Sequence, residues 1–346
     1  MADDSAAFNK ALEVSANEGR IIIVPGCTYA IARPISWVSA SNVGHVWGLE
    51  CQGAHLISRL MKAESVLSLT AHHTVRYFRL AGGLTITGSG ADGNGIHFLC
   101  PGNKANLYNL TIEGLSVERV GGHGLVCEGN VFESVITNSF FQDCKRNGAT
   151  FANAKGGICS AIQIIGCYFN QNGEYGLGTV NLDGPYGGPT DVRVFGGYCR
   201  DNRNYGFYYN NGTGSGAVEQ VGFENNCRAL KPGDPNGAHI YGQSAMQLRN
   251  CTGYNQGGGA TYLLRGWFNG LTVLEGCSQE AGGAMEQTGK SRLVQVNGND
   301  KGHVLVSRSH GGIDVVDGTA CTWSAVNSAG SSPRGALDIR GSVSSA

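Results

Sequence analysis

One type of turn residue recurs along this chain, each time directly after a short apolar segment. Gly and Asn are the residues that most readily adopt the left-handed backbone conformation, which turns the chain sharply. A strand that ends in such a corner at a nearly constant interval is typical of one coil of a solenoid. The corner residues lie 24 to 30 positions apart, and they are Gly114, Asn138, Gly166, Gly196, Gly222, Asn250 and Gly276.

A second glycine marks the start of another strand within the same coils. Each coil therefore holds at least two strands, and they lie parallel to the strands of the neighbouring coils. The sequence predicts an all-β fold, a single-stranded right-handed parallel β-helix of about ten coils. The glycines of this second set are Gly124, Gly148, Gly176, Gly206, Gly237 and Gly259.

The two ends of the chain depart from this rhythm. Near the start, a pair of aspartates can cap a short helix with Phe8 and Leu12 on its apolar face, and Gly19 ends it. We expect this helix to cover the first coil, because a solenoid exposes an apolar end. The predicted β-helix domain spans residues 1–300, and the Ser- and Gly-rich residues 301–346 form a C-terminal cap or tail.

Composition excludes several other classes. The net charge of −1 gives no attraction to nucleic acid or to an anionic membrane, and the longest aliphatic run, residues 21–24, is too short to span a bilayer. The twelve cysteines show no Cys-x-x-Cys and no zinc-ligand spacing. Three of them directly follow a corner residue and belong to one inward column, so we predict free thiols and folding in a reducing cytoplasm. These three are Cys167, Cys251 and Cys277.

Three N-terminal stretches carry a resemblance to a known family. Residues 3–12, residues 21–31 and the later Leu-Glu-Cys-Gln-Gly-Ala stretch (residues 49–54) are similar to the pectate-lyase-like β-helix superfamily. That group includes polysaccharide lyases, glycoside hydrolases, epimerases and bacteriophage tailspikes. Its members usually carry Gly-Asp-Gly just before the Asp-Asp, so the resemblance implies that a native N-terminal segment precedes this chain. It also implies an extracellular or virion-associated location and a homotrimer, but it transfers no catalytic residue.

Strand alternation separates scaffold residues from residues that face solvent. Two outward pairs of opposite charge, Arg193 with Glu219 and Arg249 with Glu275, are predicted on neighbouring strands as mainly structural contacts. A further polar column lies five residues after the corners. A backbone-satisfying ladder is the favoured interpretation of this column, although Asp201 stays a candidate catalytic acid. Its members are Asp143, Gln171, Asp201 and Asn255.

The strand after the second glycine predicts a sugar platform. Its outward positions place Tyr208 beside His239 in one column and Asn210 beside Tyr241 in the next. Aromatic rings stack on sugar C–H surfaces, and amides bind hydroxyls. We expect the longest connections to wall a groove around this platform, because insertions in solenoids often border the binding face. These connections are residues 181–190, 210–216 and 229–237.

Two chemistries fit such a groove. A lyase needs a base, His239 or Tyr208, and a cation to hold the uronate carboxylate, Arg200, Arg203 or Arg228. A glycosidase needs two carboxyl groups. The nearby acids are Asp183, Asp201, Asp234 and Glu224, of which Glu224 is preferred because it points outward.

The site prediction therefore has two parts. The candidate catalytic residues are Glu224, Asp201, His239, Tyr208 and Arg200, and the candidate substrate-binding residues are Tyr241, Asn210, Asp183, Tyr186, Arg203 and Arg228. No metal ligand and no cofactor is predicted. No acidic run indicates a calcium loop, and a cation bound in a lyase groove stays open.

The predicted function is depolymerisation of a bacterial surface or extracellular polysaccharide by a lyase or a glycoside hydrolase, for instance as part of a phage tailspike. The polysaccharide is the expected partner. Two alternatives stay open, namely a non-catalytic glycan-binding or adhesin solenoid that uses the same tyrosines, and a glycan epimerase or transferase.

Overall fold

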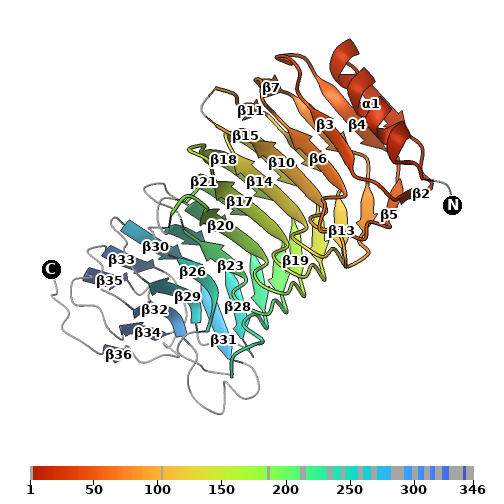
Figure 1. The fold of residues 1–346 in the computed structure, drawn as a ribbon. Helices are drawn as coiled ribbons and strands as arrows, with labels where there is room; N and C mark the ends of the chain where they lie inside the picture. The colour runs from red at the N-terminus through yellow and green to blue at the C-terminus, as the bar shows by residue number, and fades with distance from the viewer. Residues whose placement is uncertain are drawn as a thin grey trace.

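The computed structural model shows one chain wound into a parallel β-solenoid with a single N-terminal helix (Figure 1). It describes residues 3–102, 104–184, 188–210, 216–231, 237–242, 246–255, 260–265, 271–281, 292–297, 303–307, 312–315, 322–326 and 338–339. About eight turns run from β1 to β26, and against this count the predicted number of about ten coils is slightly too high. The predicted fold class is confirmed.

Three parallel sheets form the sides of the solenoid, and between residues 21 and 297 the chain visits them in the order A, B, C in each coil. Sheet A consists of β1 (Ile21–Val24), β4 (Trp47–Cys51), β8 (Phe78–Ala81), β12 (Thr111–Glu113), β15 (Val131–Thr137), β18 (Cys159–Ile165), β21 (Thr190–Phe195), β24 (Gly216–Glu219), β27 (Met246–Arg249), β30 (Leu271–Glu275), β33 (His303–Ser307) and β35 (Thr322–Val326), with β7 (Val75–Arg76) and β11 (Leu107–Tyr108) attached.

Sheets B and C complete each coil. Sheet B consists of β2 (Thr28–Ile31), β5 (His55–Ser58), β9 (Thr85–Thr87), β13 (Ser116–Glu118), β16 (Phe140–Gln142), β19 (Tyr168–Asn170), β22 (Tyr198–Arg200), β25 (Gly222–Glu224), β28 (Thr252–Asn255) and β31 (Ser278–Ala281). Sheet C consists of β3 (Ile35–Val38), β6 (Leu67–Thr70), β10 (Ile96–Cys100), β14 (Leu125–Gly129), β17 (Ala149–Asn153), β20 (Leu177–Asn181), β23 (Phe207–Tyr209), β26 (Ala238–Gly242), β29 (Ala260–Arg265), β32 (Arg292–Asn297), β34 (Gly312–Val315) and β36 (Asp338–Ile339). The division of the chain at residue 300 stays a prediction.

The repeated Gly and Asn residues found in the sequence lie at the corner between sheets A and B. Gly114, Asn138, Gly166, Gly196, Asn250 and Gly276 all adopt positive φ there, between 48° and 66°. The corner predicted at Gly222 is wrong, because Glu219 pairs with Phe195 and Arg249, which makes Gln220 the corner residue with φ of 56°.

This two-residue shift changes one of the predicted charge pairs. Arg193 lies opposite Ala217 rather than Glu219, and its Nε contacts Asp191 Oδ1 at 2.6 Å. The other pair is confirmed, because Arg249 lies opposite Glu275 and its Nε is 3.6 Å from Glu275 Oε2.

The N-terminal helix α1 (Ser5–Glu18) covers the open end of the solenoid, as predicted (Figure 1). Phe8 and Leu12 are buried against the first coils, and Gly19 ends the helix with φ of 64°. The Asp4 carboxylate accepts the Ala30 N–H at 2.9 Å and so ties the helix start to β2. Within the described residues, no helix is long and apolar enough to cross a membrane.

The interior is filled by apolar side chains and free thiols. The residues two and four positions before the corners Gly114, Gly166, Gly196 and Asn250 are buried, and so are Cys167, Cys251 and Cys277. All eleven cysteines among the described residues are free. Folding in a reducing cytoplasm stays a prediction.

A ladder of buried asparagines runs along the turn from sheet B to sheet C. Asn202 Oδ1 accepts the Asn172 N–H at 3.0 Å, and Asn226 Oδ1 accepts the Asn202 N–H at 3.3 Å. The ladder lies one residue beyond the predicted column of Asp143, Gln171 and Asp201, whose members instead adopt positive φ of 52° to 57°. These three residues turn the chain, and Asn172 and Asn202, which follow two of them, accept hydrogen bonds from backbone N–H groups of the preceding coil. The side chain of Asn255 lies outside the described residues.

Candidate functional site

One column of side chains runs along the outer face of sheet C. The strand register places these residues opposite one another on successive strands from β10 to β26. Because hydrogen-bonded strands lie about 4.8 Å apart, the column is about 24 Å long. We call it the sheet C track, and its members are His97, Val126, Thr150, Gly178, Tyr208 and Tyr241.

A second ladder runs beside the track, formed by the residues that directly precede the sheet C strand glycines. Asn94 Oδ1 accepts the His123 N–H at 3.0 Å, His123 Nδ1 accepts the Asn147 N–H at 3.2 Å, and Asn147 Oδ1 accepts the Tyr175 N–H at 3.1 Å. Each side chain thus satisfies the backbone of the next coil. This outer ladder holds its residues in a fixed position next to the track.

The imidazole of His123 has a defined role in the outer ladder. Besides the Asn147 N–H, its Nδ1 lies 2.9 Å from the Thr150 hydroxyl. A backbone N–H can only donate, so Nδ1 is the acceptor and the ring proton resides on Nε2. Burial is the main cause that lowers the His123 pKa to about 4, with smaller electrostatic contributions from Arg146 and His97, so the ring is neutral near pH 7.

A histidine and a carboxylate meet at the N-terminal end of the track. His97 Nε2 lies 3.1 Å from Glu128 Oε2, and both side chains are mostly buried. The hydrogen bond from His97 and the nearby Lys155 lower the pKa of Glu128, while burial and Asp183 act against this. This pair was not among the residues predicted from the sequence, although a spacing of one coil places the two residues on neighbouring strands.

Four tyrosines are stacked at the other end of the track. Tyr208 lies between Tyr175 and Tyr241, with ring centroids 4.8 Å and 5.1 Å away and interplanar angles of 11°. Tyr205 lies 4.8 Å from Tyr241 and completes this tyrosine stack. Burial raises the pKa of Tyr208 to about 12 and also raises the pKa of Tyr175.

The stack changes the predicted role of Tyr208 and Tyr241. Because the faces of the rings lie against one another, they are not free to form a flat platform for a sugar ring. The stack instead favours hydrogen bonding by the hydroxyls at the ring edges. A phenol with a pKa near 12 stays protonated at neutral pH, so the Tyr208 hydroxyl is a hydrogen-bond donor and not a base.

The predicted orientation of His239 is wrong. Its side chain is fully buried, packs 5.6 Å from the Phe223 ring and accepts a hydrogen bond at Nδ1 from the Asn226 amide at 3.1 Å. The register places it next to Gly206, not Tyr208, because Phe207 pairs with Ile240. His239 thus occupies the position of the inward-facing glycines and ends the buried asparagine ladder, while burial lowers its pKa to about 3.

The predicted loops border sheet C on both sides. The first two connect sheet C to sheet A, and the third connects sheet B to sheet C. Asp183 accepts the N–H groups of Lys155 and Gly156 at 2.8 Å each, and Asn210 is buried with its N–H bonded to Thr179. Tyr186 and Asp234 lie outside the described residues.

The remaining candidates lie elsewhere. Arg203 and Arg228 are exposed at the turn from sheet B to sheet C. Glu224 and Arg200 face outward from sheet B, where the Tyr198 hydroxyl donates to Glu224 Oε2 at 2.9 Å. Arg200 Nε lies 3.6 Å from Asp201 Oδ2. The single predicted site is therefore divided between two faces of the solenoid, and the Tyr208 and Tyr241 part of it lies on the sheet C track.

In the part of the chain that the structure describes, no group of three or more His, Cys, Asp or Glu side chains is arranged to hold a metal ion.

Solved structures with similar folds include proteins that act on glycans. The A-module of mannuronan C-5 epimerase AlgE4 from Azotobacter vinelandii matches 97% of this chain and 96% of its own, with a TM-score of 0.54 and 15% identity. The catalytic unit of a GH87 α-1,3-glucanase from Streptomyces thermodiastaticus matches 99% of this chain and 66% of its own, with a TM-score of 0.52 and 13% identity.

A bacteriophage protein is similar as well. The N-terminal fragment of bacteriophage Phi29 gene product 12 matches 93% of this chain and 64% of its own, with a TM-score of 0.56 and 15% identity. No protein-family model and no curated protein matches the sequence. At these identities the similarity shows the fold alone, and at that level the resemblance to pectate-lyase-like β-helix proteins is confirmed.

Proposed function

We propose that this protein binds a polysaccharide along the sheet C track and cleaves it there. The observation that carries the proposal is that hydrogen-bonding side chains lie at both ends of this column on the outside of one sheet, with His97 and Glu128 at one end and the tyrosine stack at the other. A polyhydroxylated chain needs repeated donors and acceptors along an extended surface. The structural similarity to a mannuronan epimerase and an α-1,3-glucanase supports a glycan as the ligand.

The charge states near His97 favour elimination over hydrolysis. A glycosidase needs one protonated carboxyl group as general acid. Glu128 and Asp183 both have lowered pKa values, through the hydrogen bond from His97 and the backbone N–H groups of Gly156 and Lys155 respectively. Neither carboxyl group is therefore suited to that role near pH 7, which argues for a lyase.

The residues of the track supply the groups that a uronate lyase needs. His97, oriented by Glu128, takes the proton at C5 of the uronate, the C4–O4 bond breaks, and a C4=C5 double bond forms. The Nε2–H of His123 donates to the negative charge that develops on the carboxylate. The imidazolium formed at His97 returns the C5 proton to the leaving O4 oxygen, because the tyrosine stack lies at the far end of the track. An epimerase shares the first of these steps, so the predicted epimerase alternative stays open.

The test compares two carboxylates on different faces of the solenoid. Wild-type protein is incubated with a panel of acidic and neutral polysaccharides, and new ultraviolet absorbance reports the unsaturated product. Glu128→Gln is expected to lower the rate by at least about 100-fold, because it weakens the acid–base pair. Glu224→Gln on sheet B is the matched control and should keep the wild-type rate. Loss of activity in Glu224→Gln alone would place the site on sheet B.

A non-catalytic glycan-binding protein is the second candidate. The tyrosine stack favours it, because four adjacent phenols bind hydroxyls without any proton transfer. In that case Tyr208→Phe lowers glycan affinity, and no polysaccharide in the panel is shortened. An extracellular or virion-associated location belongs to the same proposal, and the homotrimer stays a prediction that sedimentation tests.

A further inference from the structure

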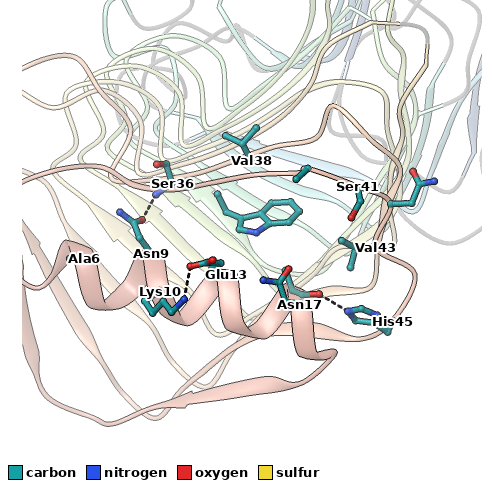
Figure 2. A pocket seen from close by; sticks show the side chains of 14 residues that line it. Ala6, Asn9, Lys10, Glu13, Asn17, Ser36, Val38, Ser41, Val43 and His45 are labelled. Carbon is teal, nitrogen blue, oxygen red and sulfur yellow. Dashed lines mark hydrogen bonds and ion pairs between the residues drawn. The ribbon is translucent and has the colours of Figure 1, made fainter.

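An open pocket lies between α1 and β3, at the N-terminal end of sheet C (Figure 2). Its volume of about 830 Å³ is within the range of small-molecule sites. The pocket is rigidly framed, because Asn9 Oδ1 accepts the Ser36 N–H at 2.7 Å and His45 Nε2 donates to the Ala16 carbonyl at 2.7 Å. These two bonds tie the helix to the strand and to the following loop.

The lining of the pocket combines an aromatic ring with neutral polar groups. The Trp37 indole is partly buried, and its centroid lies 4.5 Å from that of the fully buried Trp47, which fixes its position. Exposed hydroxyl and amide side chains surround it, namely those of Ser36, Ser41, Asn17 and Asn42. An aromatic ring with amides and hydroxyls around it is suited to a sugar, because the ring contacts C–H groups while the polar groups bind hydroxyls.

The charges in the pocket argue for a neutral sugar. Lys10 Nζ and Glu13 Oε2 are 2.9 Å apart and compensate each other, so the pair attracts neither an anion nor a cation strongly. No other Lys, Arg, Asp or Glu belongs to the described lining. A uronate carboxylate would find no unpaired cation here.

The pocket continues the sheet C track. Ser36 pairs with Ser68 and Ser68 pairs with His97, so all three occupy one outward column. Two strand spacings, about 10 Å, separate Ser36 from His97. We propose that this pocket binds a neutral sugar residue of the same polysaccharide that the track binds. This inference rests on the proposed function for the identity of the ligand, and it implies a heteropolysaccharide with both acidic and neutral sugars.

The experiment uses tryptophan fluorescence of the full chain. Glucose, galactose, mannose, rhamnose and N-acetylglucosamine are titrated into the protein up to 100 mM, with glucuronate as the charged probe. At least one neutral sugar is expected to cause a saturable change, and glucuronate is expected to bind at least tenfold more weakly. The change should disappear in Trp37→Phe, which removes the reporter.

Exposed polar variants separate binding from folding. Asn17→Ala combined with Ser41→Ala is expected to weaken neutral sugar binding at least tenfold, measured by calorimetry, without a change in the thermal unfolding midpoint. Tyr168→Phe, on the exposed face of sheet B, should leave it unchanged. The absence of saturable binding by every neutral sugar, or full binding by the double variant, would overturn the proposal.

The outcome is distinguishable from failure of the proposed function. Sugar binding at Trp37 needs no catalysis, so it is measured equally well in the Glu128→Gln variant. If sugar binds but no polysaccharide is cleaved, the pocket stands and the lyase assignment fails. If polysaccharide is cleaved but no sugar binds, the lyase assignment stands and the pocket proposal is wrong.

Discussion

Single residues decide the shape of each turn in this solenoid. The glycines before the sheet C strands are required because a side chain there points into the interior. A Cβ atom at Gly176 would lie 2.7 Å from Cys199 Sγ and 2.7 Å from the Gly206 carbonyl oxygen. His239 fills the same position in a later coil, where the interior accommodates its ring beside Phe223.

Gly176→Ala is expected to destabilise the protein by about 1–3 kcal/mol, because the added methyl group forces neighbouring atoms apart. Urea denaturation followed by circular dichroism measures the change. Gly44→Ala is the matched control, since a Cβ there meets nothing within 4 Å and φ is not positive. Equal unfolding midpoints for both variants would show that the interior absorbs the extra methyl group.

The errors at residue level have a common physical cause. The coils were predicted from the positions of glycines, but other residues occupy the same positions where the neighbouring side chains leave room for them. Gln220 adopts positive φ where glycine was expected, and His239 replaces an inward glycine. Gly222 and Gly237 lie two residues away from these positions, and the corner and the strand start were therefore predicted at these glycines. Only the strand register distinguishes these cases.

At the scale of elements, the turn from sheet B to sheet C depends on the buried asparagine ladder. Asn202 accepts from the Asn172 N–H, and its amide donates to the Phe169 carbonyl at 2.9 Å and to Asn226 Oδ1 at 2.8 Å. All three asparagines are fully buried. The ladder therefore satisfies polar groups that water does not reach.

Asn202→Leu is expected to lower the free energy of unfolding by about 3 kcal/mol or more, because it leaves several buried groups without a hydrogen bond. Guanidinium unfolding curves measure the loss. Asn17→Ala on the exposed face of α1 is the control and should change stability by less than about 0.5 kcal/mol. A small effect of Asn202→Leu would mean that water replaces the amide.

The site was predictable only in part at this scale. Alternation along strands correctly placed Tyr208 and Tyr241 outward on sheet C. His97 and Glu128 were not predicted, because the site was expected in the coils that have long connections. Their coils are short and regular, so no insertion marks them. A His and a Glu one coil apart, each beside an inward residue, were the available signal.

For the whole molecule, the average period was enough to predict the solenoid. Most coils repeat the same three strands, so an error of two residues in one coil leaves the fold unchanged. The prediction of the site is more sensitive to such an error, because a shift of two residues changes which side chains are predicted to be neighbours. This difference explains why the fold class was predicted correctly while the candidate site was divided between sheets B and C.

Two buried histidines couple the stability of the whole molecule to pH. The pKa of His123 is about 4 and that of His239 about 3 in the folded protein, against 6.5 for an ordinary histidine, mainly because burial penalises the charged ring. The unfolded chain therefore binds more protons between these values. The two neutral rings make their full contribution to the free energy of unfolding above about pH 6.5. This contribution is lost as the pH is lowered, and the loss is about 3 kcal/mol for each ring at pH 4.

We expect urea unfolding midpoints to fall between pH 7 and pH 4.5. The lowered carboxyl pKa values of Glu118 and Glu128 act in the same direction, but mainly below about pH 4.5, near the usual value of that group. The change in stability between pH 7 and pH 4.5 therefore comes mainly from the histidines. His239→Gln keeps an acceptor for the Asn226 amide and removes one titrating ring, so the loss between pH 7 and 4.5 should be smaller. The exposed His72→Gln should behave like wild type, and an unchanged loss in His239→Gln would show that this ring binds its proton equally well in the folded and unfolded chain.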